Sequence, residues 1–388
     1  NGDLKTMEES FFQNDELLIP NVDESTIDNE NASKISELSK KGYQLLKDDD
    51  TDGARAAFNE ILALDENNNY ALVGLGDIER KLNHIDLAIA NYEKCLEYFP
   101  ANNYALFGLA DCYKSMKKFN KAIDIWQQYL VHDDKNITVI TRVADAYRKI
   151  KDFKRSKELY LSVLEIEKDN AYALIGLGHL NYDFRDYKEA LYYWTRIYDL
   201  NKEDADIRVL TAIGNCHRKL KTFKDGVYYF EKALEKEPHN FYALFGLADC
   251  YRGMNQQFKS IEYWNKILEL DPENKVILTR AGDAFRTTGN YDKAIDYYTK
   301  ALNIDFDIYA AIGLALICKT QGKIDEAIER FENLIKEDPK NARLYLDLSD
   351  CYLQNKDKEN AIKVLENCLQ IDGRNSLVRN NLEKLKKA

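Results

Sequence analysis

The ten residues Tyr104-Ala105-Leu106-Phe107-Gly108-Leu109-Ala110-Asp111-Cys112-Tyr113 occur twice in this chain, because they return unchanged at Tyr242 to Tyr251. Looser copies begin at Tyr70 and Tyr172. The step from Tyr70 to Tyr104 is one period, and Tyr172 lies three such steps after Tyr70. Each copy carries apolar residues at helical spacing, and a fixed period of about 34 residues is typical of stacked helix pairs. The sequence therefore predicts an all-α repeat array with one continuous core.

Composition and charge narrow the class of protein. Of the 388 residues, 45% are hydrophobic and 31% charged, and no apolar run approaches the roughly 20 residues that cross a bilayer, so we expect no membrane span. The net charge is −11, but residues 1–33 hold nine acidic side chains and one lysine, which leaves about −3 for the rest. A nearly neutral body lacks the basic field that attracts phosphate backbones, so nucleic-acid binding is not expected.

The seven cysteines indicate a reducing compartment. Their number is odd, none forms a CxxC pair, and most occupy small apolar positions of the repeat. We therefore expect free thiols and a cytoplasmic location. Because the sequence starts at Asn1 rather than at a methionine, this expectation leaves room for a signal or anchor ahead of it.

Residues 1–33 have the composition of an acidic tail that cannot bury enough surface to fold alone. Two interpretations stay open. The tail is a flexible leader, or its apolar clusters form a short motif that docks in a groove, with Phe11, Phe12, Leu17 and Leu18 as candidate contacts.

From Ile35 onward the chain resembles the tetratricopeptide repeat family in three columns of each unit. The eighth position is small in ten units: Gly42, Gly76, Ala110, Ala144, Gly178, Gly214, Ala248, Gly282, Ala315 and Ser349. The twentieth position is also small, at Ala54, Ala88, Ala122, Ser156, Ala190, Gly226, Ser260, Ala294, Ala327 and Ala361. The twenty-fourth is large, at Phe58, Tyr92, Trp126, Tyr160, Trp194, Phe230, Trp264, Tyr298, Phe331 and Leu365. Four prolines, at 100, 238, 272 and 339, fall where the second helix of a unit should end.

The resemblance implies a right-handed superhelical α-solenoid of helix-turn-helix repeats. We expect a tail at 1–33, an array of about ten repeats at 34–375 and a capping helix at 376–388. The regular spacing changes twice, with two extra residues near Asn201 to Asp206 and one missing near Phe306-Asp307. These positions predict a longer and a shorter turn between units.

No pattern of residues indicates catalysis. The five histidines are scattered: there is no HExxH motif, and no two histidines lie at metal-ligand spacing. The side chains of Cys216 and His217 point about 100° apart on a helix, so they do not form a nucleophile and base. Gly74-Leu75-Gly76 and Gly176-Leu177-Gly178 lack the third glycine and the lysine of a phosphate loop, so we interpret them as packing glycines. We expect no enzyme activity, no metal and no cofactor.

The resemblance places positions 2, 5, 9, 12 and 13 of each first helix on the concave side of the superhelix. Position 2 is often tyrosine, position 9 often aspartate and position 12 basic in seven units, from Arg80 to Lys319 and including Arg218. The candidate groove-lining residues are Tyr70, Asp77, Arg80, Tyr104, Phe107, Asp111, Lys114, Arg142, Asp145, Arg148, Tyr172, Tyr242, Phe245, Asp249, Arg252, Arg280, Asp283 and Arg286.

Two interpretations of these residues stay open, and they are compatible. Aspartate and arginine three residues apart form exposed pairs worth about 0–1 kcal/mol each, or tyrosine, phenylalanine and arginine form a groove for an extended peptide. Phe107 and Phe245 are one of several pairs of identical residues that are separated by the same distance as Tyr104 and Tyr242. These pairs indicate either a duplicated four-unit block or two equivalent subsites. The family's clamp for acidic chaperone tails is not reproduced, since Thr138 and Val276 replace its lysine.

The sequence thus predicts a scaffold or adaptor that binds a peptide or protein in a concave groove, with self-association as a further option. Two alternatives remain: a small-molecule or lipid-binding accessory protein of a transport or envelope system, and the regulatory repeat region of a larger enzyme. The sequence does not name the partner.

Overall fold

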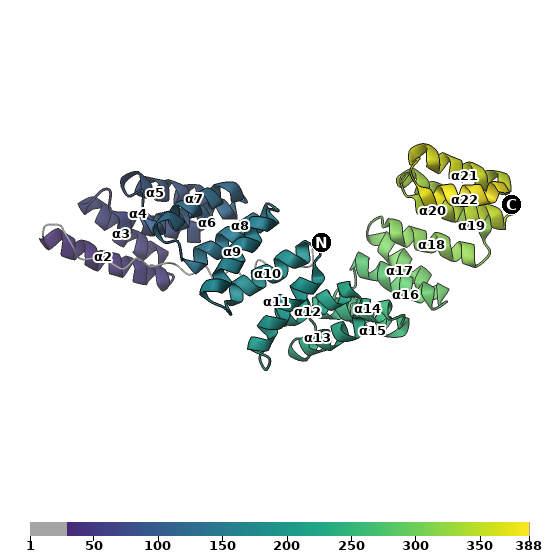
Figure 1. The fold of residues 1–388 in the computed structure, drawn as a ribbon, viewed down its shortest axis with the longest axis horizontal. Helices are drawn as coiled ribbons and strands as arrows, with labels where there is room; N and C mark the ends of the chain where they lie inside the picture. The colour runs from purple at the N-terminus through teal and green to yellow at the C-terminus, as the bar shows by residue number, and fades with distance from the viewer. Residues whose placement is uncertain (1–28, 388) are drawn as a thin grey trace. The chain divides into compact units, whose positions relative to one another are not determined.

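The computed structural model describes residues 29–387, and within this range it contains helices and turns but no strand (Figure 1). The described residues divide into two compact units, one up to residue 209 and one from residue 210, and each is a stack of helix pairs. The predicted all-α solenoid of helix pairs is confirmed, and no described helix is long and apolar enough to span a bilayer.

The first unit consists of α2 to α11 and the first residues of α12. Its helices are α2 (Asn29–Lys47), α3 (Thr51–Leu64), α4 (Asn69–Lys81), α5 (Ile85–Tyr98), α6 (Asn103–Ser115), α7 (Phe119–His132), α8 (Ile137–Lys149), α9 (Phe153–Ile166), α10 (Ala171–Asp183) and α11 (Tyr187–Leu200). The first helix of the described residues, α2, begins at Asn29, inside the range expected to be tail. The candidate motif Phe11, Phe12, Leu17 and Leu18 lies outside the described residues.

The second unit holds most of α12 and all later helices. These are α12 (Ile207–Leu220), α13 (Phe223–Lys236), α14 (Phe241–Gly253), α15 (Gln257–Leu270), α16 (Lys275–Thr287), α17 (Tyr291–Ile304), α18 (Ile308–Thr320), α19 (Ile324–Glu337), α20 (Ala342–Gln354), α21 (Lys358–Ile371) and α22 (Ser376–Lys387). The boundary between the units follows the six-residue turn 201–206, which holds the two predicted extra residues. The turn 305–307 has three residues, as the predicted deletion requires, whereas the other turns between pairs have four.

The turn inside each pair has one residue in the left-handed region. This residue is glycine at Gly289 and Gly322, and elsewhere it is Asp49, Asn83, Lys117, Lys151, Arg185, Lys221, Asn255 or Lys356. In the turn after α4, the amide of His84 donates to the carbonyl of Glu79 and that of Asn83 to Arg80. This is the Schellman arrangement, which satisfies the last carbonyls of a helix and reverses the chain for the second helix.

Seven of the eight four-residue turns between pairs share an Asp/Glu-x-x-Asn pattern, and the exception, 99–102, begins with Phe99. In the turn before α8, the carboxylate of Asp133 accepts from the side-chain amide of Asn136, and the side-chain oxygen of Asn136 accepts from the backbone amide of Val139. The first bond orients the asparagine, and the second caps the next first helix. Asn68, Asn102, Asn170, Asn240 and Asn274 cap in the same way.

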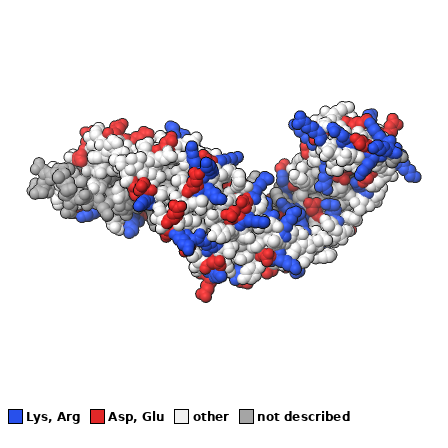
Figure 2. Space-filling view, in the orientation of Figure 1, with Lys and Arg blue, Asp and Glu red and all other residues white. Residues whose placement is uncertain are grey.

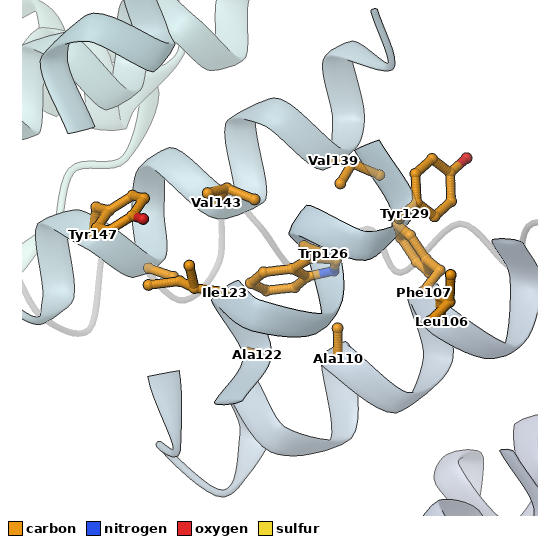
Figure 3. Close-up of a cluster of buried hydrophobic side chains, with 11 residues drawn as sticks. Leu106, Phe107, Ala110, Ala122, Ile123, Trp126, Tyr129, Val139, Val143 and Tyr147 are labelled. Carbon is orange, nitrogen blue, oxygen red and sulfur yellow. The ribbon is translucent and has the colours of Figure 1, made fainter. Parts of the chain in front are cut away.

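The core repeats around the large residue at position 24. Trp126 of α7 is fully buried and lies between Ala110 of its own pair and Val143 of the next first helix (Figure 3). In the preceding pair a β-carbon added at Gly76 would lie 2.6 Å from the Tyr92 ring, and one added at Gly108 would lie 2.3 Å from it. Both glycines are therefore packing residues: the ring occupies the volume of their missing side chains and joins one pair to the next.

Candidate functional site

The candidate groove-lining residues all lie on the first helix of a pair, which is an even-numbered helix. Within a unit of the chain, consecutive first helices are neighbours: α4 contacts α6, α8 contacts α10 and α16 contacts α18. Position 9 of one first helix therefore lies at a seam, where side chains from the previous and the following first helix can reach it.

In the first unit, Asp111 of α6 occupies such a seam. The Arg142 Nη1 atom of α8 donates to Asp111 Oδ1 at 3.0 Å, and Arg80 Nη1 of α4 lies 3.7 Å from Asp111 Oδ2. The guanidinium carbon of Arg142 lies 4.8 Å from the centre of the Phe107 ring. One buried carboxylate thus joins three first helices, and an aromatic ring supports one of its two arginines.

In the second unit, Asp249 of α14 has the same neighbours. The Arg218 Nη1 atom of α12 donates to Asp249 Oδ2 at 2.7 Å, and Arg280 Nη1 of α16 donates to Asp249 Oδ1 at 3.2 Å. The Arg280 guanidinium lies 4.9 Å from the centre of the Phe245 ring. Arg252 adds a third cation at 3.1 Å.

The two clusters are copies of each other. Each arginine lies 31 residues from its aspartate, before it in one case and after it in the other. All four members recur at the interval that separates Tyr104 from Tyr242. The structure therefore extends the repeated stretch to a repeated three-helix arrangement. We refer to the two sets, Arg80–Phe107–Asp111–Arg142 and Arg218–Phe245–Asp249–Arg280, as the first and second arginine clusters.

The aspartates of the neighbouring pairs have partners as well. Asp145 accepts from Arg148 at 2.8 Å, and Arg148 also pairs with Asp183 of α10 at 2.8 Å. Asp283 accepts from the Tyr298 hydroxyl at 2.7 Å, and the nearest Arg286–Asp283 approach is 3.5 Å. These two sites differ in their partners although their sequences are alike.

Burial and charge oppose each other at Asp77, whose carboxylate accepts from the Tyr92 hydroxyl at 2.6 Å. Burial raises the pKa of Asp77 above its ordinary value, while Arg80 and the Tyr92 hydroxyl act in the opposite direction. Burial also acts to lower the pKa of Arg80, but Tyr92 and the carboxylates of Asp77 and Asp111 outweigh it and raise that pKa. Arg80 therefore stays charged, and the cost of burial falls on Asp77.

The remaining candidates are partly accessible. Tyr172 is exposed, whereas Tyr70, Tyr104 and Tyr242 are half-buried. The backbone carbonyl of Tyr70 accepts from the Tyr43 hydroxyl at 3.1 Å. Lys114 is half-buried, and Arg252 is exposed.

The expectation of exposed Asp–Arg pairs is wrong for four aspartates. Asp77, Asp111, Asp145 and Asp249 are each 6% exposed, because the adjacent first helices cover position 9. Phe107 is buried too, in the hydrophobic cluster around Trp126 (Figure 3). A Phe107→Ala variant would therefore create a core cavity instead of testing a ligand contact.

Sequence reasoning did not single out two residues that the structure brings into the site. Arg218 was noted only as one of the basic residues at position 12 and was not a candidate site residue. Its distance from Arg80 along the chain is the same as the distance from Tyr104 to Tyr242, and this was the signal that could have found it. Asp183 pairs with Arg148 across helices, and nothing in its own repeat position indicates that role. The described residues contain no group of three or more His, Cys, Asp or Glu side chains placed to hold a metal ion.

Comparison with known families agrees with these observations. Sequence models described as tetratricopeptide repeat match residues 73–136, 137–170, 229–262, 277–308 and 320–385. Together the matches cover more than half of the chain. The chain belongs to the tetratricopeptide repeat family. Its helix pairs, small columns and inter-pair aromatic residues are those of this family.

No curated protein matches the sequence. Among solved structures, parts of this chain are similar to MamA, at 21% identity over 42% of this chain and 94% of that one, with a TM-score of 0.40. Pseudomonas aeruginosa pilF is 15% identical over 55% of this chain and 96% of that one, with a TM-score of 0.48. YrrB, described as a TPR protein with an unusual peptide-binding site, is 19% identical over 48% of this chain and 95% of that one, with a TM-score of 0.41.

Proposed function

We propose that this tetratricopeptide repeat protein is a non-enzymatic scaffold that binds an extended peptide or protein segment along its first helices. The observation that carries the proposal is the repeated arginine cluster. Each cluster holds an arginine between a carboxylate and an aromatic ring where first helices meet, and the exposed fraction of the side chain is 10% for Arg142 and 35% for Arg280.

An arginine held in this way is suited to recognition. The guanidinium has five N–H donors in a rigid plane, and its aspartate and ring partners fix that plane before a ligand arrives. Less conformational entropy is then lost on binding, which favours affinity. Arginine and aromatic residues are also the side chains that most often dominate the binding energy of protein interfaces.

The reduced state of the cysteines is part of the same proposal. All seven are buried free thiols in the structure. We infer that the protein works in a reducing compartment, which supports a cytoplasmic location.

Site-specific photocrosslinking tests the binding proposal. A photoreactive phenylalanine would replace Tyr309 on first helix α18 and, as the matched control, Phe258 on second helix α15; both native side chains are strongly exposed. In the source cell we expect a discrete adduct from position 309 and none from position 258. Equal crosslinking at positions 309 and 258 would exclude binding along the first helices. So would the absence of an adduct both at position 309 and at Tyr172, which lies on another first helix.

A further inference from the structure

The two arginine clusters are built alike but differ in their charge balance. Arg80 of the first cluster lies between two carboxylates, since its Nη2 atom is 3.6 Å from Asp77 Oδ1 and its Nη1 atom is 3.7 Å from Asp111 Oδ2. At the corresponding place beside the second cluster, Asn215 replaces Asp77, and its side-chain oxygen accepts from Nε and Nη2 of Arg218. Asparagine accepts the same hydrogen bonds without a negative charge, so the second cluster has one carboxylate where the first has two.

Three arginines of the second unit share the single carboxylate of Asp249. Its Oδ2 atom accepts from Nη1 of Arg218 at 2.7 Å. Its Oδ1 atom accepts from Nη2 of Arg252 at 3.1 Å and from Nη1 of Arg280 at 3.2 Å. Lys114 stands at the place of Arg252 in the first copy, so three cations face two carboxylates there and only one here. We call the three arginines and Asp249 the three-arginine site, and it has an excess of two positive charges.

The neighbouring ion pairs do not cancel this excess. The only other acidic side chain on α12, α14 and α16 is Asp283, which accepts from the Tyr298 hydroxyl and lies 3.5 Å from Arg286. Lys275 at the start of α16 pairs with Asp305 at 2.8 Å. Figure 2 shows Lys and Arg side chains gathered on the hollowed side of this unit. Among them, the three-arginine site is the place where several cations share one carboxylate.

The three-arginine site is also more accessible than the first cluster. The exposed fraction of the side chain is 35% for Arg280 and 49% for Arg252, but 10% for Arg142, which corresponds to Arg280. In the part of the chain that the structure describes, Arg280 donates to Asp249 alone. Its guanidinium carbon lies 4.9 Å from the centre of the Phe245 ring, which fixes the plane. The other N–H groups of Arg280 therefore form a fixed edge that can donate to an anion.

Aromatic rings border this site and are more accessible than in the first copy. Phe107 is buried, and its ring centre lies 6.5 Å from that of Tyr129, which is beside it in Figure 3. In the second unit Ile267 stands at the place of Tyr129, and Phe245 is half-buried. Phe241, one helical turn before Phe245, is exposed, and the two ring centres are 5.9 Å apart. A bound segment can therefore make apolar contacts next to its anionic group.

The excess charge and the donors match a phosphoryl group. A phosphorylated side chain carries about −1.5 to −2 charges at pH 7 and has three acceptor oxygens, whereas a carboxylate carries one charge on two oxygens. Arg252 and Arg280 donate to the same oxygen of Asp249, so their guanidinium groups lie close together. One phosphoryl group can accept hydrogen bonds from both.

A single phosphoryl group fits better than a nucleic acid. A nucleic acid carries a negative charge at every nucleotide and needs a row of cations, but the nearby Lys275 and Arg286 already face carboxylates. We propose that the three-arginine site binds a phosphorylated side chain of a peptide or protein partner. The proposal rests on the proposed function and names the chemistry that the partner presents at this site.

Fluorescence anisotropy of the full chain with three labelled peptide libraries tests the proposal. The libraries have phosphoserine, glutamate or serine at a central position and mixed residues around it. We expect the phosphoserine library to bind roughly tenfold more tightly than the glutamate library, because the second negative charge and the third oxygen strengthen the charge-assisted hydrogen bonds. The serine library should bind most weakly.

Asn215→Asp gives the sharpest variant, because it restores the second carboxylate and keeps all three arginines. The first copy already holds Asp77 at this place, so the variant should fold, which circular dichroism checks. It should weaken binding of the phosphoserine library about fivefold or more and leave the serine library unchanged. Asn367→Asp makes the same chemical change at an exposed residue of second helix α21, and should bind as the wild type does. Arg280→Gln should weaken the phosphoserine library about tenfold.

Three results would overturn the inference. Equal binding of the phosphoserine and glutamate libraries would indicate a site for acidic peptides. Inorganic phosphate that binds as tightly as the phosphoserine library would indicate a site for the free ion. Unchanged binding in both Asn215→Asp and Arg280→Gln would mean that the phosphoryl group binds elsewhere.

Failure of this inference is distinguishable from failure of the scaffold function. An adduct at position 309 in the cell, without any preference among the three libraries, would overturn this inference alone. A preference for phosphoserine that Asn215→Asp removes, without an adduct at position 309 or 172, would overturn extended binding along the first helices and leave the phosphoryl site in place.

Discussion

Ser156 and Ser260 occupy the same small column, position 20, but their hydroxyl groups have different environments. Ser260 donates to the carbonyl of Ala248 at 2.9 Å, whereas Ser156 Oγ is buried without a hydrogen-bond partner in the described part of the chain. A buried polar atom without a partner costs about 1–3 kcal/mol, and a satisfied hydrogen bond contributes about 1 kcal/mol.

We predict opposite effects of alanine at these two residues. Ser156→Ala should raise the free energy of unfolding by about 1 kcal/mol, and Ser260→Ala should lower it by about 1 kcal/mol. Urea titration followed by circular dichroism measures both. If Ser156→Ala were the more destabilising variant, the hydroxyl of Ser156 would have to be bonded in solution.

The pH dependence of stability tests the environment of Asp77. Its pKa is raised in the folded state, so the folded chain holds the proton more tightly than the unfolded chain does. This group therefore lowers stability as pH rises from the ordinary Asp value of 3.8 through the higher folded value. The Asp77→Asn variant does not have this loss of stability. The difference between its free energy of unfolding and that of the wild type should therefore increase as the pH rises through this window.

Asp305 supplies a control of opposite sign. Its pKa is lowered by a hydrogen bond from Lys275, so its contribution is present above the ordinary value and lost as the pH falls through the folded one. For Asp305→Asn the same difference should decrease as pH rises. Parallel slopes for the two variants would contradict the assignment of burial as the main cause at Asp77.

At the scale of elements, the turn inside each pair offers a test that involves no side-chain contact. Lys151 has φ +67°, and Gly289 occupies the equivalent place with φ +79° and no atom within 4 Å of the position that a β-carbon would take. A left-handed conformation costs an L-residue about 1–2 kcal/mol, while glycine loses more backbone entropy on folding. Lys151→Gly should therefore stabilise by roughly 0.5–1 kcal/mol, and Gly289→Ala should destabilise by about 1 kcal/mol.

Thermal unfolding of the two variants, compared with wild type, measures these effects. Lys149→Gly, at the last residue of α8 and two residues before Lys151, is the matched control and should not stabilise, since glycine is a poor helix former. Stabilisation by the control would mean that the gain at Lys151 has another origin.

The elements were predictable because each depends on nearby residues. The small and large columns specified which residues pack, and the departures from the regular spacing specified the six-residue and three-residue turns. The burial of Asp111 was not predictable in this way, because its partners Arg80 and Arg142 lie 31 residues before and after it. That offset falls just short of one period, and it depends on how one first helix sits beside the next rather than on any single helix. The exposed face of a first helix therefore cannot be read from its own sequence.

For the whole molecule, cysteine reactivity reports how far unfolding spreads along the array. Burial raises the pKa of Cys95, Cys112, Cys216 and Cys250 to about 12, so few of these thiols are ionised near pH 8. The native protein should therefore react slowly with a thiol reagent, and the unfolded, non-reduced chain should react at seven sites.

The order of reaction follows from the nearest-neighbour stability of a repeat array. Cys368 lies in α21, which in the described part of the chain is covered on its outer side by the single helix α22 instead of by a further helix pair. It should be modified before Cys216 and Cys250 when labelled peptides are counted by mass spectrometry over time in low urea. Simultaneous modification of all seven would indicate all-or-none unfolding, and fewer than seven sites after unfolding would reveal a disulfide.

The two identical stretches 104–113 and 242–251 also make this chain open to change in length by recombination. A crossover between them would delete the block from one stretch to the other and restore the same ten residues at the junction. The deleted block would be four whole helix pairs, and the product would keep Asn102 as the cap and Ser260 and Trp264 at their places in the following second helix. An unequal exchange in the other direction would insert a third arginine cluster in register. A lineage carrying this gene can therefore vary its number of helix pairs in a single genetic event, without a new core having to evolve.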